Sequence, residues 1–90
     1  MNEVLRDTIY AMGFEDSLVF DSPEYDDAII GITDDGRVIY EYDKMVDSMM
    51  ERDHISKDEA LDFIEYNTIR ALPYFGDKAP IILHKIDVVM

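Results

Sequence analysis

The stretch that most constrains the fold is residues 28–42, AIIGITDDGRVIYEY. Two runs rich in β-branched and aromatic residues flank Asp34-Asp35-Gly36, which is a strong turn signal. This combination predicts a β-hairpin. The remaining segments of the chain can then be interpreted as elements that cover its apolar face.

The hydrophobic pattern decides between two possible loop lengths for this hairpin. A two-residue loop would put the apolar sets of the two strands on opposite faces. A three-residue loop over 34–36, with its glycine in the left-handed conformation, places Ile32 opposite Val38 and Ile30 opposite Tyr40. In that register one face collects Ala28, Ile30, Ile32, Val38, Tyr40 and Tyr42. We therefore expect the three-residue loop.

The other segments predict three helices and two further strands. A capping box begins the third helix at Ser56 and Glu59, and Pro73 is expected to end it. Asn2 and Gly13 are expected to cap the first helix. The order α-β-ββ-α-α-β predicts one α+β domain over residues 1–90, in which helices cover a small antiparallel sheet built on the hairpin. Apolar spacing and breakers place helices at 3–12, 43–52 and 56–72, strands at 17–20 and 81–89, and loops at 21–27 and 73–80.

Charge is the outlying property of the composition. The 90 residues include 21 acidic and 8 basic side chains, which gives a net charge of −13. Free nucleic acid and anionic membrane surfaces would repel such a chain, so we expect neither as a direct partner. The acidic N-terminal stretch is unlike a signal peptide, and no apolar run approaches the length of a membrane span. We therefore expect a cytoplasmic location.

Carboxylates repeat along one side of each of the last two predicted helices. Like charges at this spacing cost about 0.2–0.5 kcal/mol per pair, so their repetition points to a functional reason. Their separation of roughly 6 Å is close to that of backbone phosphates, which suggests imitation of a nucleic acid. The alternative is a solvated face relieved by Lys44, Arg52 and Lys57. We call the two rows the acidic stripes; they consist of Asp43, Asp47 and Glu51, and of Asp58, Asp62 and Glu65.

Aromatic residues border the end of the third helix. Tyr66, Arg70 and Tyr74 are of the types that anchor protein interfaces, and Phe75 follows them. They predict a docking edge next to the second stripe. The alternative is that Tyr74 and Phe75 fold back and cap the core.

Catalytic and metal-binding motifs are lacking. The chain has no cysteine, no G-x-S-x-G nucleophile and no glycine-rich phosphate loop. His54 and His84 have no ligand spacing around them, and the acidic loop 21–27 lacks the glycine of a calcium loop. The acidic third helix also argues against a DNA-binding helix-turn-helix. We expect no catalytic residues, no cofactor and no metal.

Three segments resemble small acidic proteins of phages and mobile elements of Gram-positive bacteria: YDDAIIGITDDGRVIYEYDKMV, ISKDEALDFIEYNTIRALPYFG and KAPIIL. That group carries over no functional residues. The resemblance implies a setting, because small proteins of such elements often inhibit host defence machinery. CRISPR effector nucleases are a frequent target, and acidic inhibitors often occupy the groove meant for nucleic acid.

The first hypothesis is a non-enzymatic inhibitor of a basic nucleic-acid-handling protein, plausibly a CRISPR nuclease. The second is a homo-oligomeric scaffold that associates through the hairpin edge or the Met-rich second helix. The third is a metalloprotein that uses His54 and His84. For the first hypothesis the predicted partner-binding residues are Asp43, Asp47, Glu51, Asp58, Asp62, Glu65, Tyr66, Arg70 and Tyr74.

Overall fold

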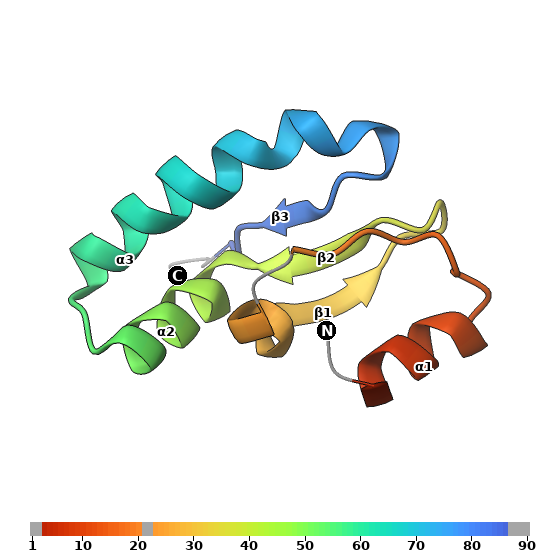
Figure 1. The fold of residues 1–90 in the computed structure, drawn as a ribbon, viewed down its shortest axis with the longest axis horizontal. Helices are drawn as coiled ribbons and strands as arrows, with labels where there is room; N and C mark the ends of the chain where they lie inside the picture. The colour runs from red at the N-terminus through yellow and green to blue at the C-terminus, as the bar shows by residue number, and fades with distance from the viewer. Residues whose placement is uncertain (1–2, 21–22, 87–90) are drawn as a thin grey trace.

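The computed structural model describes residues 3–20 and 23–86 and shows three strands surrounded by helices (Figure 1). The predicted α+β class is confirmed. η1 and η3 are 3₁₀ segments, and η2 is a π-helical turn. The elements are α1 Glu3–Ala11, η1 Pro23–Ala28, β1 Ile29–Ile32, β2 Val38–Glu41, α2 Tyr42–Asp53, α3 Lys57–Phe63, η2 Ile64–Thr68, η3 Ile69–Lys78 and β3 Ile81–Leu83.

β1 and β2 form the predicted antiparallel hairpin with the predicted three-residue loop. Ile32 pairs with Val38, as expected. The Thr33 amide donates to the Arg37 carbonyl at 2.8 Å, and the Gly36 amide donates to the Thr33 carbonyl at 2.9 Å. Gly36 has φ +86°, which is the left-handed conformation this loop requires.

The register changes further along β1, where the prediction was wrong. Ile29, and not Ile30, lies opposite Tyr40, and Gly31 lies opposite Ile39. Ile30 is the extra residue of a β-bulge, and its side chain is 43% exposed. A glycine inside a strand favours such a bulge, because it weakens regular pairing and has no side chain to pack.

The sheet is mixed and not purely antiparallel. Its order is β1-β2-β3, with β2 in the middle and β3 parallel to β2. The chain reaches β3 only after a long helical crossover, and such a connection joins parallel strands (Figure 1). The last strand is also shorter than predicted, because residues 84–86 are irregular. The predicted cap Asn2 and positions 87–89 lie outside the described residues.

The helical crossover runs through the position where the sequence predicted a stop. The predicted capping box forms, since the Glu59 amide donates to Ser56 Oγ at 3.2 Å. Pro73, however, lies inside η3, and helical turns continue past it as far as a kink at Gly76, where φ 76° and ψ −149° are not helical. The chain departs from the i→i−4 bonding pattern in η2 and η3, so a residue without an N–H does not have to end it.

α2 supplies much of the core. Met45 and Met49 are fully buried, so the Met-rich side of this helix is not available as a dimer surface. The predicted polar loop before β1 forms η1, and Tyr25 from η1 is 1% exposed. The buried cluster consists of Ile9, Phe20, Tyr25, Ala28, Val38, Tyr40, Tyr42, Met45, Val46, Met49, Ala60 and Ile64.

Phe20 is the centre of an aromatic group in this core. Residues 17–20 form no strand, contrary to the prediction, but they carry Phe20 into the interior. Its ring centroid lies 4.8 Å from that of Tyr40, 6.1 Å from that of Tyr25 and 5.7 Å from that of Phe75. Its amide donates to the Tyr40 hydroxyl at 3.1 Å. The Ser17 hydroxyl also donates to the Gly36 carbonyl at 2.8 Å. Aromatic packing and these two hydrogen bonds therefore hold this segment without a strand.

Candidate partner-binding site

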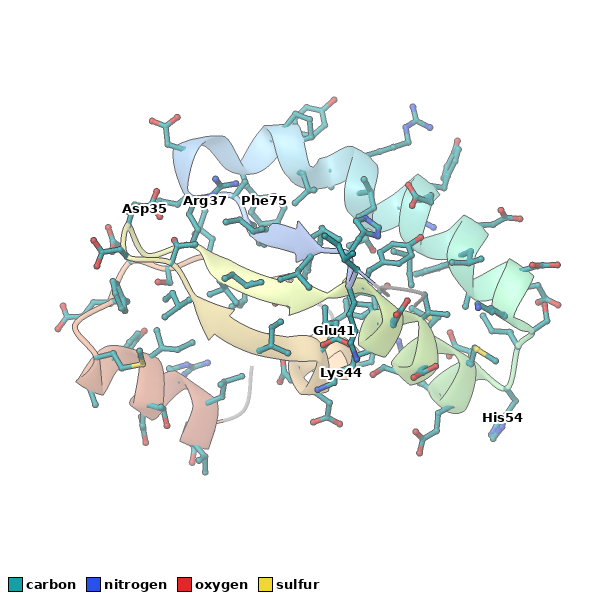
Figure 2. All side chains as sticks on the ribbon, turned by 180° about the vertical axis from the view of Figure 1, so that it is seen from behind. Asp35, Arg37, Glu41, Lys44, His54 and Phe75 are labelled. Carbon is teal, nitrogen blue, oxygen red and sulfur yellow. The ribbon has the colours of Figure 1, made fainter. Side chains whose placement is uncertain are left out.

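α2 and α3 form a helical hairpin at one end of the molecule, connected near His54 (Figures 1 and 2). The apolar side of α2 packs inward, so residues spaced four apart on its other side face solvent. All six carboxylates of the acidic stripes are exposed. The stripes therefore have the exposure that a charged binding surface needs.

The described cations make their ion pairs and hydrogen bonds with groups other than the stripe carboxylates. Arg52 pairs with Glu24 of η1, in a hollow that Glu51 of the first stripe also lines. Arg37 donates through Nε to the Ala79 carbonyl at 2.8 Å, and Lys78 donates to the Asp35 carbonyl at the hairpin loop. Within residues 3–20 and 23–86, no lysine or arginine forms an ion pair with a stripe carboxylate. Lys44 and Lys57, considered above as relief, make no such contact.

Tyr42 connects the two stripes, a role that no sequence motif predicted. It begins α2, and its hydroxyl donates to Glu65 Oε1 at 2.8 Å. Its ring lies 4.6 Å from that of His84. The pKa of the Tyr42 phenol is raised to about 12, mainly by burial, with the hydrogen-bonded Glu65 carboxylate and the nearby Asp43 carboxylate acting in the same direction. A neutral phenol thus holds the second stripe against the start of the first.

Part of the predicted docking edge is assembled. The Arg70 guanidinium lies 4.8 Å from the centroid of the Tyr66 ring, a cation–π arrangement. A surface hollow is lined by Asp62, Glu65, Tyr66 and Arg70. These four predicted residues, from α3, η2 and η3, therefore do lie together.

Other predicted residues lie apart from this hollow. Glu51 lines a different hollow, which it shares with Glu24 and Arg52. Tyr74 is 91% exposed on η3, whereas the neighbouring Phe75 packs against Phe20. Each of the two alternatives for Tyr74 and Phe75 therefore holds for one residue: Phe75 covers the core, and Tyr74 is exposed and can contact a partner. The Arg52–Glu24 pair was not predicted, because residues so far apart in sequence leave no local signal.

Neither histidine contributes to a cluster of ligands. His54 ends α2 with φ 54° and is exposed, and His84 is exposed beside Tyr42. In the described part of the chain, no three histidine, aspartate or glutamate side chains gather as a metal site would require. A helix long and apolar enough to cross a membrane is likewise not found among these residues.

The structure defines a small α+β protein with a mixed sheet and an exposed acidic helical hairpin. Comparison of the chain with protein-family models, curated proteins and solved structures found no match.

The raised phenol pKa values predict a loss of stability at high pH. Burial raises the pKa of Tyr40 to about 12, as it does for Tyr42, against about 10 in the unfolded chain. Between about pH 10 and about pH 12, the Tyr40 and Tyr42 phenols are therefore still protonated in the folded state but deprotonated in the unfolded state. The contribution of these two phenols to the free energy of unfolding should therefore be constant below about pH 10 and then fall, by at most about 1.4 kcal/mol per pH unit for each phenol.

Urea denaturation from about pH 8 to about pH 11.5 measures this dependence. Tyr42→Phe should show a shallower fall above about pH 10, because one late-titrating phenol is gone. Equal slopes for wild type and Tyr42→Phe would contradict the assignment.

Proposed function

We propose that this chain is a non-enzymatic binding protein that inhibits a basic, nucleic-acid-handling protein, with a CRISPR effector nuclease as the specific candidate. The acidic stripes would meet lysine and arginine side chains that otherwise hold phosphates. Tyr66, Arg70 and Tyr74 would provide the aromatic and guanidinium anchors beside them. Opposite charges on the two surfaces would speed association and select the partner.

One observation carries this proposal: the six stripe carboxylates are exposed along α2, α3 and the following η2, and no described lysine or arginine forms an ion pair with them, although Arg70 lines the hollow of Asp62 and Glu65. Arg52, the basic residue of the last turn of α2, is held by Glu24 instead. The Tyr42–Glu65 hydrogen bond fixes the second stripe relative to α2. A surface of this kind keeps its negative charge available for a partner.

A homo-oligomeric scaffold is the second candidate, and one feature favours it. β1 is an edge strand of the sheet, and Ile30 on it is 43% exposed. Edge strands pair readily with other chains. The Met-rich side of α2 does not offer a dimer surface, since Met45 and Met49 are fully buried. A dimer formed through β1 would bury apolar surface and should resist salt.

Charge reversal tests the first proposal. The triple variant Asp43→Lys, Asp47→Lys, Glu51→Lys should weaken inhibition of the partner by about 10- to 100-fold, since exposed ion pairs are worth up to about 1 kcal/mol each. The assay is DNA cleavage by a panel of guide-loaded CRISPR nucleases, with inhibition titrated at low and high salt. Inhibition by the wild-type chain should decline as salt rises.

A matched variant keeps the result specific. Asp7→Lys, Glu15→Lys, Asp16→Lys reverses three exposed acids outside the helical hairpin and changes the net charge by the same amount. It should inhibit like wild type. An equal loss of inhibition in both triple variants would mean that net charge alone, and not the position of the stripes, causes the effect. No inhibition of any nuclease, together with a salt-resistant dimer in native mass spectrometry, would favour the scaffold.

A further inference from the structure

A second surface lies at the opposite side of the sheet, where α1 runs outside β1 (Figures 1 and 2). Between them is a hollow of about 410 Å³ whose lining is almost entirely apolar. α1 contributes Leu5 and Ile9 to it, Met12 follows just after α1, and β1 contributes all four of its residues, from Ile29 to Ile32. We call this hollow the α1–β1 slot.

The slot runs along the outer edge of β1, which pairs with no strand on that side among the described residues. The slot is lined on one side by α1 and on the other by all four residues of β1, so it follows the side of β1 that faces away from β2. β1 lies at the end of the strand order and has β2 on its other side.

The hairpin register also turns backbone groups towards the slot. Thr33 and Arg37 are joined by a backbone hydrogen bond of 2.8 Å, so the neighbouring Ile32–Val38 pair is of the non-hydrogen-bonded kind. In such a pair the N–H and C=O of each residue point away from its partner strand. The donor and acceptor of Ile32 therefore face the outer edge, where an added strand would bond to them.

Apolar side chains remain exposed around this edge. Ile30 is 43% exposed and Met12 is 56% exposed. Val4, on α1 next to the slot, is 78% exposed. β1, with the sequence IIGI, carries no charge or proline, which are common protections of an edge strand; its protection is limited to its short length, the bulge at Ile30 and the nearby α1.

Charge distinguishes the two ends of the slot. A second hollow continues it past Leu5, Thr8 and Ile29, and there the lining includes Glu3 and Asp27. Both carboxylates are exposed. A second copy of this chain, with a net charge of −13, would add negative charge at that end. A segment that carries a lysine or arginine there would be complementary to it.

We propose that the α1–β1 slot binds an extended peptide segment of a partner protein by β-strand addition. The segment pairs with the edge of β1 and has apolar side chains at alternate positions, which meet the apolar wall of α1. A lysine or arginine at one end of the segment meets Glu3 and Asp27. This mode combines backbone hydrogen bonds for affinity with side-chain pockets for specificity. It does not depend on the acidic stripes.

A phage-displayed library of random dodecapeptides, selected against the full chain, tests this proposal. We expect enriched sequences in which apolar residues alternate and a lysine or arginine occurs at one end. The enriched peptide, made synthetically, should shift the backbone amide NMR signals of residues 29–32. Ile30→Lys should weaken its binding at least 10-fold, because a charge is placed on the edge that the peptide must cover.

Two further variants make the result specific. Ile86→Lys is the same substitution at a residue that is 85% exposed beyond β3, on the other edge of the sheet, and should change binding less than 2-fold. The double variant Glu3→Lys, Asp27→Lys should bind the basic peptide more weakly. It should bind tightly again when the lysine or arginine of the peptide is replaced by glutamate. Peptide binding should also survive Asp43→Lys, Asp47→Lys, Glu51→Lys, so this result is separate from that for inhibition.

Other outcomes would overturn the proposal. These are the absence of any enriched peptide, enriched peptides that bind Ile30→Lys as well as wild type, and signals that shift only outside β1 and α1. A wild-type dimer in sedimentation that Ile30→Lys converts to a monomer would assign the edge to a second copy of the chain.

Discussion

Met49→Ala is expected to lower the free energy of unfolding by about 2–5 kcal/mol. The Met49 side chain is fully buried in α2, within the cluster that joins this helix to the sheet. Alanine removes the buried side-chain atoms and leaves a cavity that the surrounding core can only partly fill. A domain of this length has a total stability of about 5–13 kcal/mol, so the loss is a large fraction of it.

Urea denaturation followed by circular dichroism measures this loss, and thermal unfolding should show a midpoint lower by about 10 °C or more. Met12→Ala is the matched control, because Met12 is 56% exposed and the same atoms are removed. It should change stability by less than about 0.5 kcal/mol. A similar loss in both variants would mean that Met49 is not in the core. A stabilised Met49→Ala would indicate that the Met-rich side of α2 serves another purpose.

Gly36→Val is expected to destabilise the fold by about 3 kcal/mol, which makes it the second large effect. Gly36 has φ +86° in the hairpin loop, and the left-handed conformation costs an ordinary residue about 1–2 kcal/mol and a β-branched one more. A Cβ atom there would also lie 3.3 Å from Phe14 Cδ1 and 3.4 Å from Lys78 Nζ. Backbone strain and crowding therefore add.

Two other glycines separate these causes. Gly13 has φ +94° and open space where a Cβ atom would lie, so Gly13→Val should show the backbone cost alone. Gly31 has neither a positive φ nor a close neighbour, and Gly31→Ala should be nearly neutral. Chemical denaturation of the three variants should give the order Gly36, Gly13, Gly31 from largest loss to smallest. Equal losses at Gly36 and Gly13 would show that crowding by Phe14 and Lys78 contributes nothing.

Local rules were sufficient where a short segment decides its own conformation. The three-residue loop followed from one glycine and the apolar pattern on both sides of it, and the structure has that loop. The capping box at Ser56 and Glu59 is a contact within one helical turn, and it forms. The exposure of the acidic stripes also followed from sequence, because helical periodicity opposes them to the buried side of α2.

Local rules failed where distant segments compete. Pro73 marks a boundary in sequence, yet packing keeps η3 helical through it, and Phe75 from this segment meets Phe20. The bulge at Ile30 and the exposure of that side chain depend on how β1 fits against β2. The predicted strand over 17–20 is held by aromatic packing around Phe20 and not by a ladder.

The candidate site shows the same division. Sequence named the carboxylates and the aromatic and guanidinium anchors, and four of these residues, Asp62, Glu65, Tyr66 and Arg70, line one hollow. It could not name Tyr42 as the link to Glu65 or Glu24 as the partner of Arg52. Those contacts join residues more than twenty positions apart, and no local spacing encodes them.

By itself, the sequence determined the α+β class, the hairpin loop, the helix cap and the large negative charge of this protein. Each of these depends on composition or on backbone conformations and periodicities that span a few residues. Only the tertiary structure decided that β3 runs parallel to β2, that Tyr42 holds Glu65, and that a slot remains between α1 and β1. These three features depend on which surfaces fit together once the chain is compact. The free energy of that packing is shared among residues far apart in sequence, so no local segment encodes it.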